Sequence, residues 1–245
     1  MIGKLLNQDE QKAIVSKYAV ESLFKANIIT DGIKLGMGTG STVEHVIKAV
    51  ANLINNGKLK DIAVVPTSDG TLVRCEELGI PIYSLNSKRI AGHLDVSIDG
   101  ADRVDSNKNL IKGGGAALLK EKIVAYNSDK FIVVLDSKKK VESLICDFPI
   151  PIEVIPFAYK TVLLALEKRR INAKLRQGSG KIGPTITDNG NYILDLTYPK
   201  DFHLEAKKEE LELNNIVGVV ENGFFTNTNA MQVFLAKEDG SVENY

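Results

Sequence analysis

The sequence predicts an α/β protein with a doubly wound, mostly parallel sheet and a second, smaller α+β domain. Up to residue 145, short apolar runs bounded by turn residues alternate with segments of helical period. These runs are continuously apolar, as expected for strands that helices cover on both faces. After a proline-rich segment at residues 148–158, the pattern changes to short strands and helices typical of a small unit with a four-stranded sheet.

The first half contains a capped helix and five candidate strands. Asn7 can cap a helix whose apolar face includes Val15, Ala19 and Leu23. In a doubly wound sheet, ligands bind beyond the carboxyl ends of the strands. The candidate strands are the apolar runs IKLGMG at 33–38, IAVVPT at 62–67, IPIYSL at 80–85, LDVSI at 94–98 and FIVVLD at 131–136.

In the second half, three prolines mark a boundary, and Pro156 can start an amphipathic helix that ends at Lys168. The small unit continues with NYILDL at 191–196, a charged helix over about 203–213 and IVGVVE at 216–221. The last apolar run, MQVFLA at 231–236, fits either the small sheet or a return to the first domain.

Composition and charge exclude several classes of protein. The 31 basic and 31 acidic side chains cancel, so no nucleic-acid or membrane surface is predicted. The opening MIGKLLNQDEQK is too polar for a signal peptide, and no window approaches a membrane span. Two cysteines, Cys75 and Cys146, lack metal-site spacing and form no disulfide framework. We expect a reduced, cytoplasmic, globular protein.

The first candidate site is LGMGTGSTVEHVI, where a strand ends and a helix starts near Ser41. Hydroxyls in this turn and free amides at the helix start can bind an anion. The third glycine comes too early for a dinucleotide fingerprint, and no Gly-Lys-Ser/Thr of a P-loop is present. A plain glycine-rich turn with a Ser/Thr cap explains the spacing equally well. The residues concerned are Thr39, Gly40, Ser41 and Thr42.

The segment VPTSDGT ends a second candidate strand and precedes a helix that runs to about Leu78. Taken alone, Ser68 or Asp69 is best explained as an ordinary helix N-cap. On a parallel sheet, however, this turn would face the same edge as the first one.

The segment DVSIDGADRVD, from Asp95 to Asp105, carries four aspartates. It begins like a calcium loop, but Arg103 and Ser106 occupy the ninth and twelfth positions, where ligands belong. No metal is therefore predicted. An Asp-Gly turn that ends a strand is the simplest alternative to a catalytic role.

The segment LIKGGGAALLKEKIVAYN places three glycines before a helix that starts at Ala116. Such a run marks a loop that something else approaches closely. Lys120 and Lys122 can point to water, and spacing alone favours a solvent-facing Glu121 as well.

Because each of these segments follows a strand, one crevice could hold hydroxyls, carboxylates, a lysine and a glycine loop. That set suits a small phosphorylated, polyhydroxy substrate better than a nucleotide.

At these residues the chain resembles the type A family of ribose-5-phosphate isomerases. The shared motifs, in order, are GMGTGST, IDGAD, KGGGAALLKEKIV, LDSKK, FPIPIEVIP and TDNGNYILD. The resemblance implies cofactor-free interconversion of D-ribose 5-phosphate and D-ribulose 5-phosphate in the non-oxidative pentose phosphate pathway, by a homodimer or homotetramer. The alternatives are a non-catalytic sugar-phosphate-binding regulator and a related sugar-phosphate deaminase or CoA transferase. A deaminase would need histidines arranged for catalysis. The three histidines here are far apart in the sequence, at His45, His93 and His203.

The resemblance also implies domains and residue roles. Residues 1–146 and about 229–245 would form a Rossmann-like catalytic domain, and about 147–228 a ferredoxin-like domain that mediates oligomerisation. Glu121 would be the general base, Lys112 the cation for the enediolate, Asp99 the aid to ring opening and Asp102 a group that orients hydroxyls. The residues implied in substrate binding are Thr39, Gly40, Ser41, Thr42, Gly100, Ala101, Gly113, Gly114, Gly115, Lys139 with Lys138 as its rival, and Lys12. Arg103 departs from the acid usual in the family and leaves the electrostatics beside Asp102 open.

Overall fold

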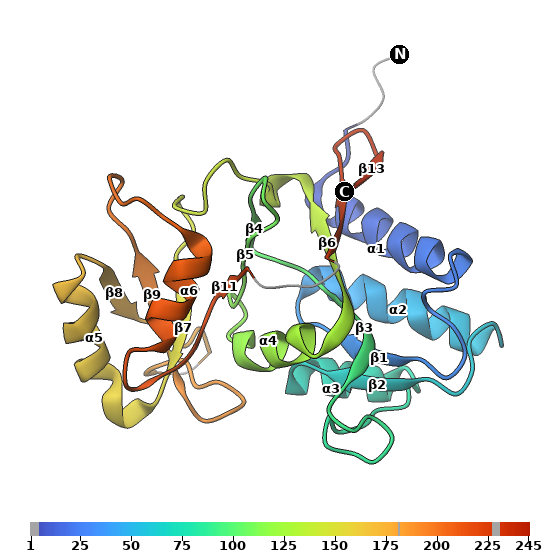
Figure 1. Cartoon of the computed structure of the whole chain (residues 1–245). Coiled ribbons are helices and arrows are strands. Elements are labelled where there is room, and N and C mark those ends of the chain that lie inside the picture. The colour runs from blue at the N-terminus through green and yellow to red at the C-terminus, as the bar shows by residue number, and fades with distance from the viewer. Residues whose placement is uncertain (1–4, 181, 227–230) are drawn as a thin grey trace. The chain divides into compact units, whose positions relative to one another are not determined.

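A computed structural model describes residues 5–180, 182–226 and 231–245 (Figure 1). The chain divides into two compact units, which we describe separately. The first comprises the described residues within Met1–Gly100, Lys120–Lys139 and Thr228–Tyr245, and the second those within Ala101–Leu119 and Lys140–Asn227. The predicted domain limit near residue 228 lies outside the described residues, and the predicted domain division stays a prediction.

The first unit is built on a six-stranded sheet in the order β13-β12-β6-β3-β1-β2. Every pair is parallel except the one between β12 and β13. Met37 pairs with Pro66 on one side and with Ile98 on the other, so β1, β2 and β3 end at the same edge. The strands are β1 (Lys34–Met37), β2 (Ala63–Pro66), β3 (Leu94–Asp99), β6 (Ser128–Asp136), β12 (Gln232–Ala236) and β13 (Val242–Asn244).

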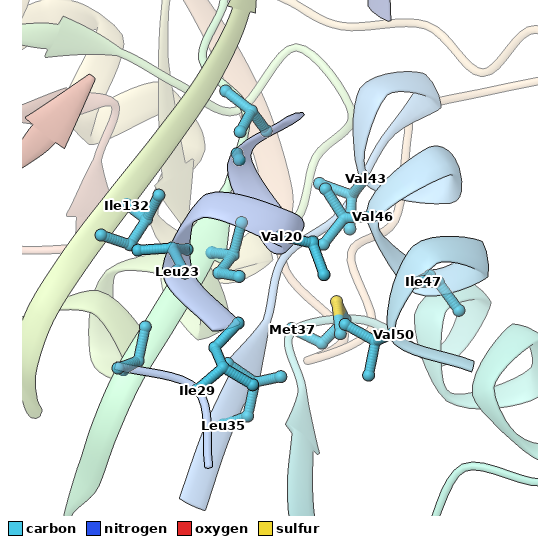
Figure 2. Packing of buried hydrophobic residues seen from close by; sticks show 14 of the residues in the cluster. Val20, Leu23, Ile29, Leu35, Met37, Val43, Val46, Ile47, Val50 and Ile132 are labelled. Atoms are coloured by element: carbon cyan, nitrogen blue, oxygen red, sulfur yellow. The ribbon is translucent and has the colours of Figure 1, made fainter. Parts of the chain in front are cut away.

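Helix α1 (Gln8–Lys25) begins after Asn7, the cap that the sequence predicts, and the structure adds Glu10 to form a capping box. The Asn7 side chain accepts from the Glu10 amide at 2.9 Å, and the Glu10 carboxylate accepts from the Asn7 amide at 2.8 Å. Helix α1 packs with α2 (Ser41–Asn55) against one face of the sheet, where Val20, Leu35 and Val46 are buried (Figure 2). This layer is the main core of the first unit.

The opposite face of the sheet is covered by α4 (Leu118–Tyr126), whose first two residues belong to the second unit. A Cβ added at Gly36 of β1 would lie 2.4 Å from Val124 Cγ1, so only glycine lets the helix approach the strand this closely. Helix α3 (Asp69–Glu77) and the 3₁₀ turn Ser137–Lys139 complete the unit. The doubly wound arrangement is confirmed.

The second unit carries an antiparallel sheet in the order β10-β7-β9-β8. Its sequence order is strand, helix, strand, strand, helix, strand, which with this strand order is the predicted ferredoxin-like arrangement. Its elements are β7 (Ile150–Val154), the 3₁₀ turn Pro156–Ala158 with α5 (Tyr159–Lys168), β8 (Asn172–Leu175), β9 (Tyr192–Thr197), α6 (Ala206–Asn214) and β10 (Val219–Asn222).

Three details differ from the sequence predictions. IPIYSL is not a strand: it makes one bridge, between Val64 and Ile82, and then leaves the sheet. The proline-rich segment contains β7, although its prolines indicated only a boundary. A small sheet of β4 (Arg103–Val104), β5 (Leu110–Ile111) and β11 (Phe224–Phe225) was not predicted. MQVFLA, which fitted two positions, becomes β12 of the larger sheet.

No helix in the described part of the chain combines the length and apolarity needed to cross a bilayer.

Candidate active site

The predicted site residues are divided between the two units, because the chain passes from one to the other after Gly100 and returns after Leu119. The first unit holds Lys12, Thr39, Gly40, Ser41, Thr42, Asp99, Gly100, Glu121 and Lys139. The second unit holds Ala101, Asp102, Lys112, Gly113, Gly114 and Gly115. We call Thr39–Thr42 the TGST loop and Lys112–Gly115 the KGGG loop.

Asp99 lies at the end of β3 beneath the TGST loop, with only 3% of its surface exposed. Its Oδ1 accepts from the Gly100 amide at 2.7 Å and from the Thr39 amide at 3.2 Å. A Cβ added at Gly38 would lie 2.1 Å from Asp99 Cγ, so the loop can cross this carboxylate only because Gly38 has no side chain. Asp99 is therefore buried and held in one orientation.

The TGST loop opens α2 with backbone amides rather than a side-chain cap. Gly40 is the N-cap residue at φ +116°, in the left-handed region that favours glycine, and it makes no side-chain cap hydrogen bond. Ser41 is exposed and Thr42 is half-buried. The amides of this turn carry the positive end of the helix dipole, which suits a phosphate.

A cluster of four hydroxyls joins the TGST loop to the end of β2. Thr39 Oγ1 lies 2.8 Å from both Thr67 Oγ1 and Ser68 Oγ. Thr71 Oγ1 donates to the Gly38 carbonyl at 2.7 Å, and Ser68 caps α3 by accepting from the Thr71 amide at 3.1 Å. Of the two residues that the sequence offers as the cap, Ser68 or Asp69, the structure shows Ser68. The sequence placed both turns at one edge but gave no sign that their hydroxyls bond, and this bonding fixes the loop.

Glu121 lies in the first turn of α4 and is only 5% exposed, so the solvent-facing position that spacing favours is wrong. Lys122 is also buried, at 4% exposure, with Nζ 5.7 Å from the centroid of the Tyr126 ring. Lys120 is partly exposed and pairs with Asp69 at 3.1 Å. A buried carboxylate on a helix packed firmly against the sheet has the fixed position that a general base requires.

In the second unit, the KGGG loop contacts the Asp102 carboxylate at Gly114. The Gly114 amide donates to Asp102 Oδ2 at 2.7 Å, and a Cβ at Gly114 would lie 2.7 Å from Asp102 Oδ1. The loop starts at Lys112, whose amide donates to the Gly223 carbonyl at 2.9 Å. The Lys112 side chain is buried, with Nζ 5.6 Å from the centroid of the Phe225 ring. The structure thus groups Asp102, Lys112 and the three glycines.

The remaining members of DVSIDGADRVD have structural roles. Arg103 donates from Nη1 to the Asp102 carbonyl at 2.7 Å, and its guanidinium carbon lies 4.8 Å from the centroid of the Phe148 ring. Asp95 accepts from the Lys34 amide at 2.8 Å, and Asp105 accepts from two amides of the turn that ends at Asn109. Arg103 is thereby accounted for by local packing.

The predicted phosphate-binding lysines are less constrained. Lys12 pairs with Asp9 at 3.3 Å in the first turns of α1. Lys138 is exposed and Lys139 half-buried in the 3₁₀ turn after β6, and no contact favours one over the other. Among the described residues, no group of three or more His, Cys, Asp or Glu side chains is arranged to hold a metal ion.

Comparison with known proteins gives the family. Residues 63–240 match the family model for ribose 5-phosphate isomerase A (phosphoriboisomerase A). A ribose-5-phosphate isomerase A from Treponema denticola is 51% identical over 239 residues, which cover 98% of this chain and 100% of that one. The chain belongs to the ribose 5-phosphate isomerase A family. The resemblance seen in its motifs is confirmed.

Further relatives agree along almost the whole chain. The Pyrococcus horikoshii ribose-5-phosphate isomerase A is 44% identical and covers 90% of this chain and 91% of its own. A solved D-ribose-5-phosphate isomerase in complex with phospho-erythronic acid superposes with a TM-score of 0.89 at 41% identity, covering 98% of this chain and 99% of that one. The Methanocaldococcus jannaschii enzyme has a TM-score of 0.86 at 38% identity, with 96% and 97% covered.

Proposed function

We propose that the chain interconverts D-ribose 5-phosphate and D-ribulose 5-phosphate, an aldose–ketose isomerisation through a cis-enediolate that needs no cofactor. The observation that carries this proposal is 51% identity to a ribose-5-phosphate isomerase A over 98% of the chain. The buried side chains of Asp99, Lys112 and Glu121 support it. Ionisable side chains are rarely buried in proteins unless they are paired or belong to a functional site.

The chemical difficulty is removing a proton from carbon next to a carbonyl. We assign this step to Glu121, which would take the proton from one of the first two carbons and return it to the other. A positioned general base contributes about 10²–10⁴-fold to such a rate. Burial on the rigid helix α4 supports this role.

The negative charge that develops on the carbonyl oxygen needs a fixed positive partner. We assign this to the Lys112 ammonium, because one preorganised donor at such an oxygen is worth about 10²–10³-fold in rate. Asp102, oriented by the Gly114 amide, would hold substrate hydroxyls. Asp99, fixed beneath the TGST loop, would move a proton during opening of the furanose ring.

Phosphate binding would fall to the TGST loop, with Lys139 or its rival Lys138 and with Lys12. Backbone amides at the start of α2 can donate hydrogen bonds to a phosphate. Binding the phosphate, which is remote from the reacting carbons, would hold those carbons in position for the reaction. The relative solved with phospho-erythronic acid, itself a phosphorylated ligand, supports a site of this kind.

We further propose that the protein is a cytoplasmic homo-oligomer, a dimer or a tetramer. The second unit exposes Ile155 (47%) just before the 3₁₀ turn, Phe157 (98%) in that turn and Leu164 (60%) in α5. Exposed apolar side chains of this size on adjoining segments are typical of a surface that another chain covers. Light scattering during gel filtration distinguishes this from a monomer.

The test of the activity is to mix pure protein with ribose 5-phosphate and follow ketose formation, with and without a chelator. We expect catalytic ketose formation that the chelator leaves unchanged. Absence of ketose contradicts the proposed activity, and a chelator-induced loss that added metal restores contradicts the cofactor-free mechanism.

A further inference from the structure

Arg176 is the residue after β8, and its guanidinium is bonded on two sides within the second unit. One edge pairs with the Asp195 carboxylate of β9: Nε lies 2.8 Å from Oδ2, and Nη2 donates to Oδ1. The remaining nitrogen, Nη1, donates at 3.0 Å to the carbonyls of both Gly113 and Gly114. A two-pronged ion pair fixes the plane of the guanidinium, so Nη1 is aimed at the KGGG loop.

The peptide bond between Gly113 and Gly114 connects Arg176 to Asp102. All peptide bonds in the described chain are trans, so the carbonyl and the N–H of this unit point in opposite directions. The carbonyl accepts from Arg176, and the N–H donates to Asp102 Oδ2 at 2.7 Å. A cation on the carbonyl side polarises the peptide and strengthens the N–H as a donor.

We propose that Arg176, held in place by Asp195, is a positioning residue that sets the KGGG loop and, through the Gly113–Gly114 peptide, the Asp102 carboxylate. Its side chain is only 17% exposed and that of Asp195 only 22%, so solvent does not screen the pair as it screens a surface ion pair. The role rests on the proposed function, since it matters for catalysis only if Asp102 and Lys112 act on the sugar. The proposal also explains the role of Asp195, the last residue of TDNGNYILD, which orients the Arg176 guanidinium.

The experiment compares wild type with Arg176→Met and Arg176→Lys in the full-length protein. Lysine keeps the positive charge but lacks the planar guanidinium with its several fixed N–H donors. It therefore cannot bond the Asp195 carboxylate and the carbonyls of Gly113 and Gly114 at the same time. The matched control is Arg170→Lys in the same unit, because Arg170 pairs with Asp201 at 3.2 Å while both side chains are at least 70% exposed. The readouts are kcat and KM for ribose 5-phosphate, the melting temperature, and hydrogen exchange of the Gly114 amide measured by NMR without substrate.

We expect kcat to fall by about 10²-fold in both Arg176 variants, the cost typical of misplacing a catalytic group by about 1 Å. KM should change less than kcat, because the phosphate contacts assigned to the TGST loop are left intact. Gly114 amide exchange should accelerate by at least about tenfold, the factor for weakening one hydrogen bond to a charged group. Arg170→Lys should match wild type in every readout.

A folded Arg176→Lys variant with the kcat of wild type overturns the proposal, and so does unchanged exchange of the Gly114 amide. If Arg176→Met does not fold, Arg176→Lys decides the question alone. A wild-type protein without isomerase activity contradicts the proposed function, while the amide-exchange comparison still decides whether Arg176 sets the loop.

Discussion

The TGST loop and the KGGG loop are both rich in glycine, but they are held in different ways. The TGST loop is bonded by the hydroxyls of Ser68 and Thr71, which lie in the N-cap and first turn of α3, directly after the neighbouring strand β2. The KGGG loop is bonded through its backbone, by the nearby Asp102 and by residues more than 60 positions further along the chain. The first loop is therefore fixed by the order of parallel strands, and the second by the packing of the ferredoxin-like unit.

The comparison predicts that the largest effect comes from Gly223, which lies far from the KGGG loop in sequence. A Cβ there would lie 2.4 Å from the Lys112 carbonyl oxygen and 3.0 Å from the Pro151 carbonyl oxygen, and backbone cannot rotate away. We expect Gly223→Ala to lower the free energy of unfolding by about 1–3 kcal/mol and kcat by about 10²-fold.

The control is Gly180→Ala, where an added Cβ meets no atom within 4 Å. Urea unfolding and steady-state kinetics measure both effects. A Gly223→Ala protein that behaves like Gly180→Ala would show that the KGGG loop does not depend on this contact.

For the TGST loop we expect a smaller effect from Gly38→Ala. The added Cβ would lie 2.1 Å from Asp99 Cγ, but a side chain, unlike backbone, can turn aside. We predict a loss of kcat of about tenfold to 10²-fold, because Asp99 leaves its bonds to Thr39 and Gly100, with modest destabilisation. Gly70→Ala is the control, since its nearest new contact is 3.8 Å away. Greater damage from Gly38→Ala than from Gly223→Ala would reverse the comparison.

Ser68→Ala removes the cap of α3 and one hydroxyl bonded to Thr39. We expect the free energy of unfolding to fall by about 0.5–2 kcal/mol, the usual value of an N-cap. The activity should fall less than in Gly38→Ala, since Thr67 and Thr71 still hold the loop. Thermal melts and kinetics at one substrate concentration are sufficient, and full loss of activity would show that Ser68 itself binds substrate.

The effect that is smallest at neutral pH concerns Cys75, a fully buried thiol in α3. Burial, together with the nearby Glu44 carboxylate, raises the pKa of the Cys75 thiol from 9.0 to about 11. Between these values the folded state keeps a proton that the unfolded chain loses, so stability falls as pH rises. The loss is at most about 1.4 kcal/mol per pH unit.

Urea unfolding of wild type and Cys75→Ala between pH 8 and pH 11 isolates this contribution, because all other titrations are shared. The stability of wild type should fall more steeply than that of the variant. Parallel pH profiles would contradict the assigned cause.

Local signals in the sequence were enough to predict most elements and the sheet edge where the TGST loop and Asp99 lie. Asn7 and Glu10 cap α1, and the apolar runs that became β1, β2, β3 and β6 have the continuous burial of a sheet covered on both faces. The strand predicted for IPIYSL was wrong, because β propensity does not show whether a segment has a neighbouring strand to pair with along its whole length. Only its bridge to Val64 forms.

The features that the sequence could not predict depend on contacts between residues that are far apart in the sequence. The helical spacing around Glu121 gave a solvent-facing position, because nothing local shows that α4 is pressed onto Gly36 of β1. The bonds from Arg176 to the KGGG loop join residues 62 and 63 positions apart. No pattern of period two or 3.6 encodes such a contact.

The most direct test of the central claim is the turnover of Glu121→Gln beside Glu76→Gln, an exposed glutamate on α3. With Glu121 as general base, its amide variant should bind ribose 5-phosphate with near wild-type affinity, measured by calorimetry. Its kcat should nevertheless fall by about 10²–10⁴-fold, whereas Glu76→Gln keeps the wild-type rate. A Glu121→Gln protein that forms ketose at the wild-type rate would remove Glu121 from the mechanism.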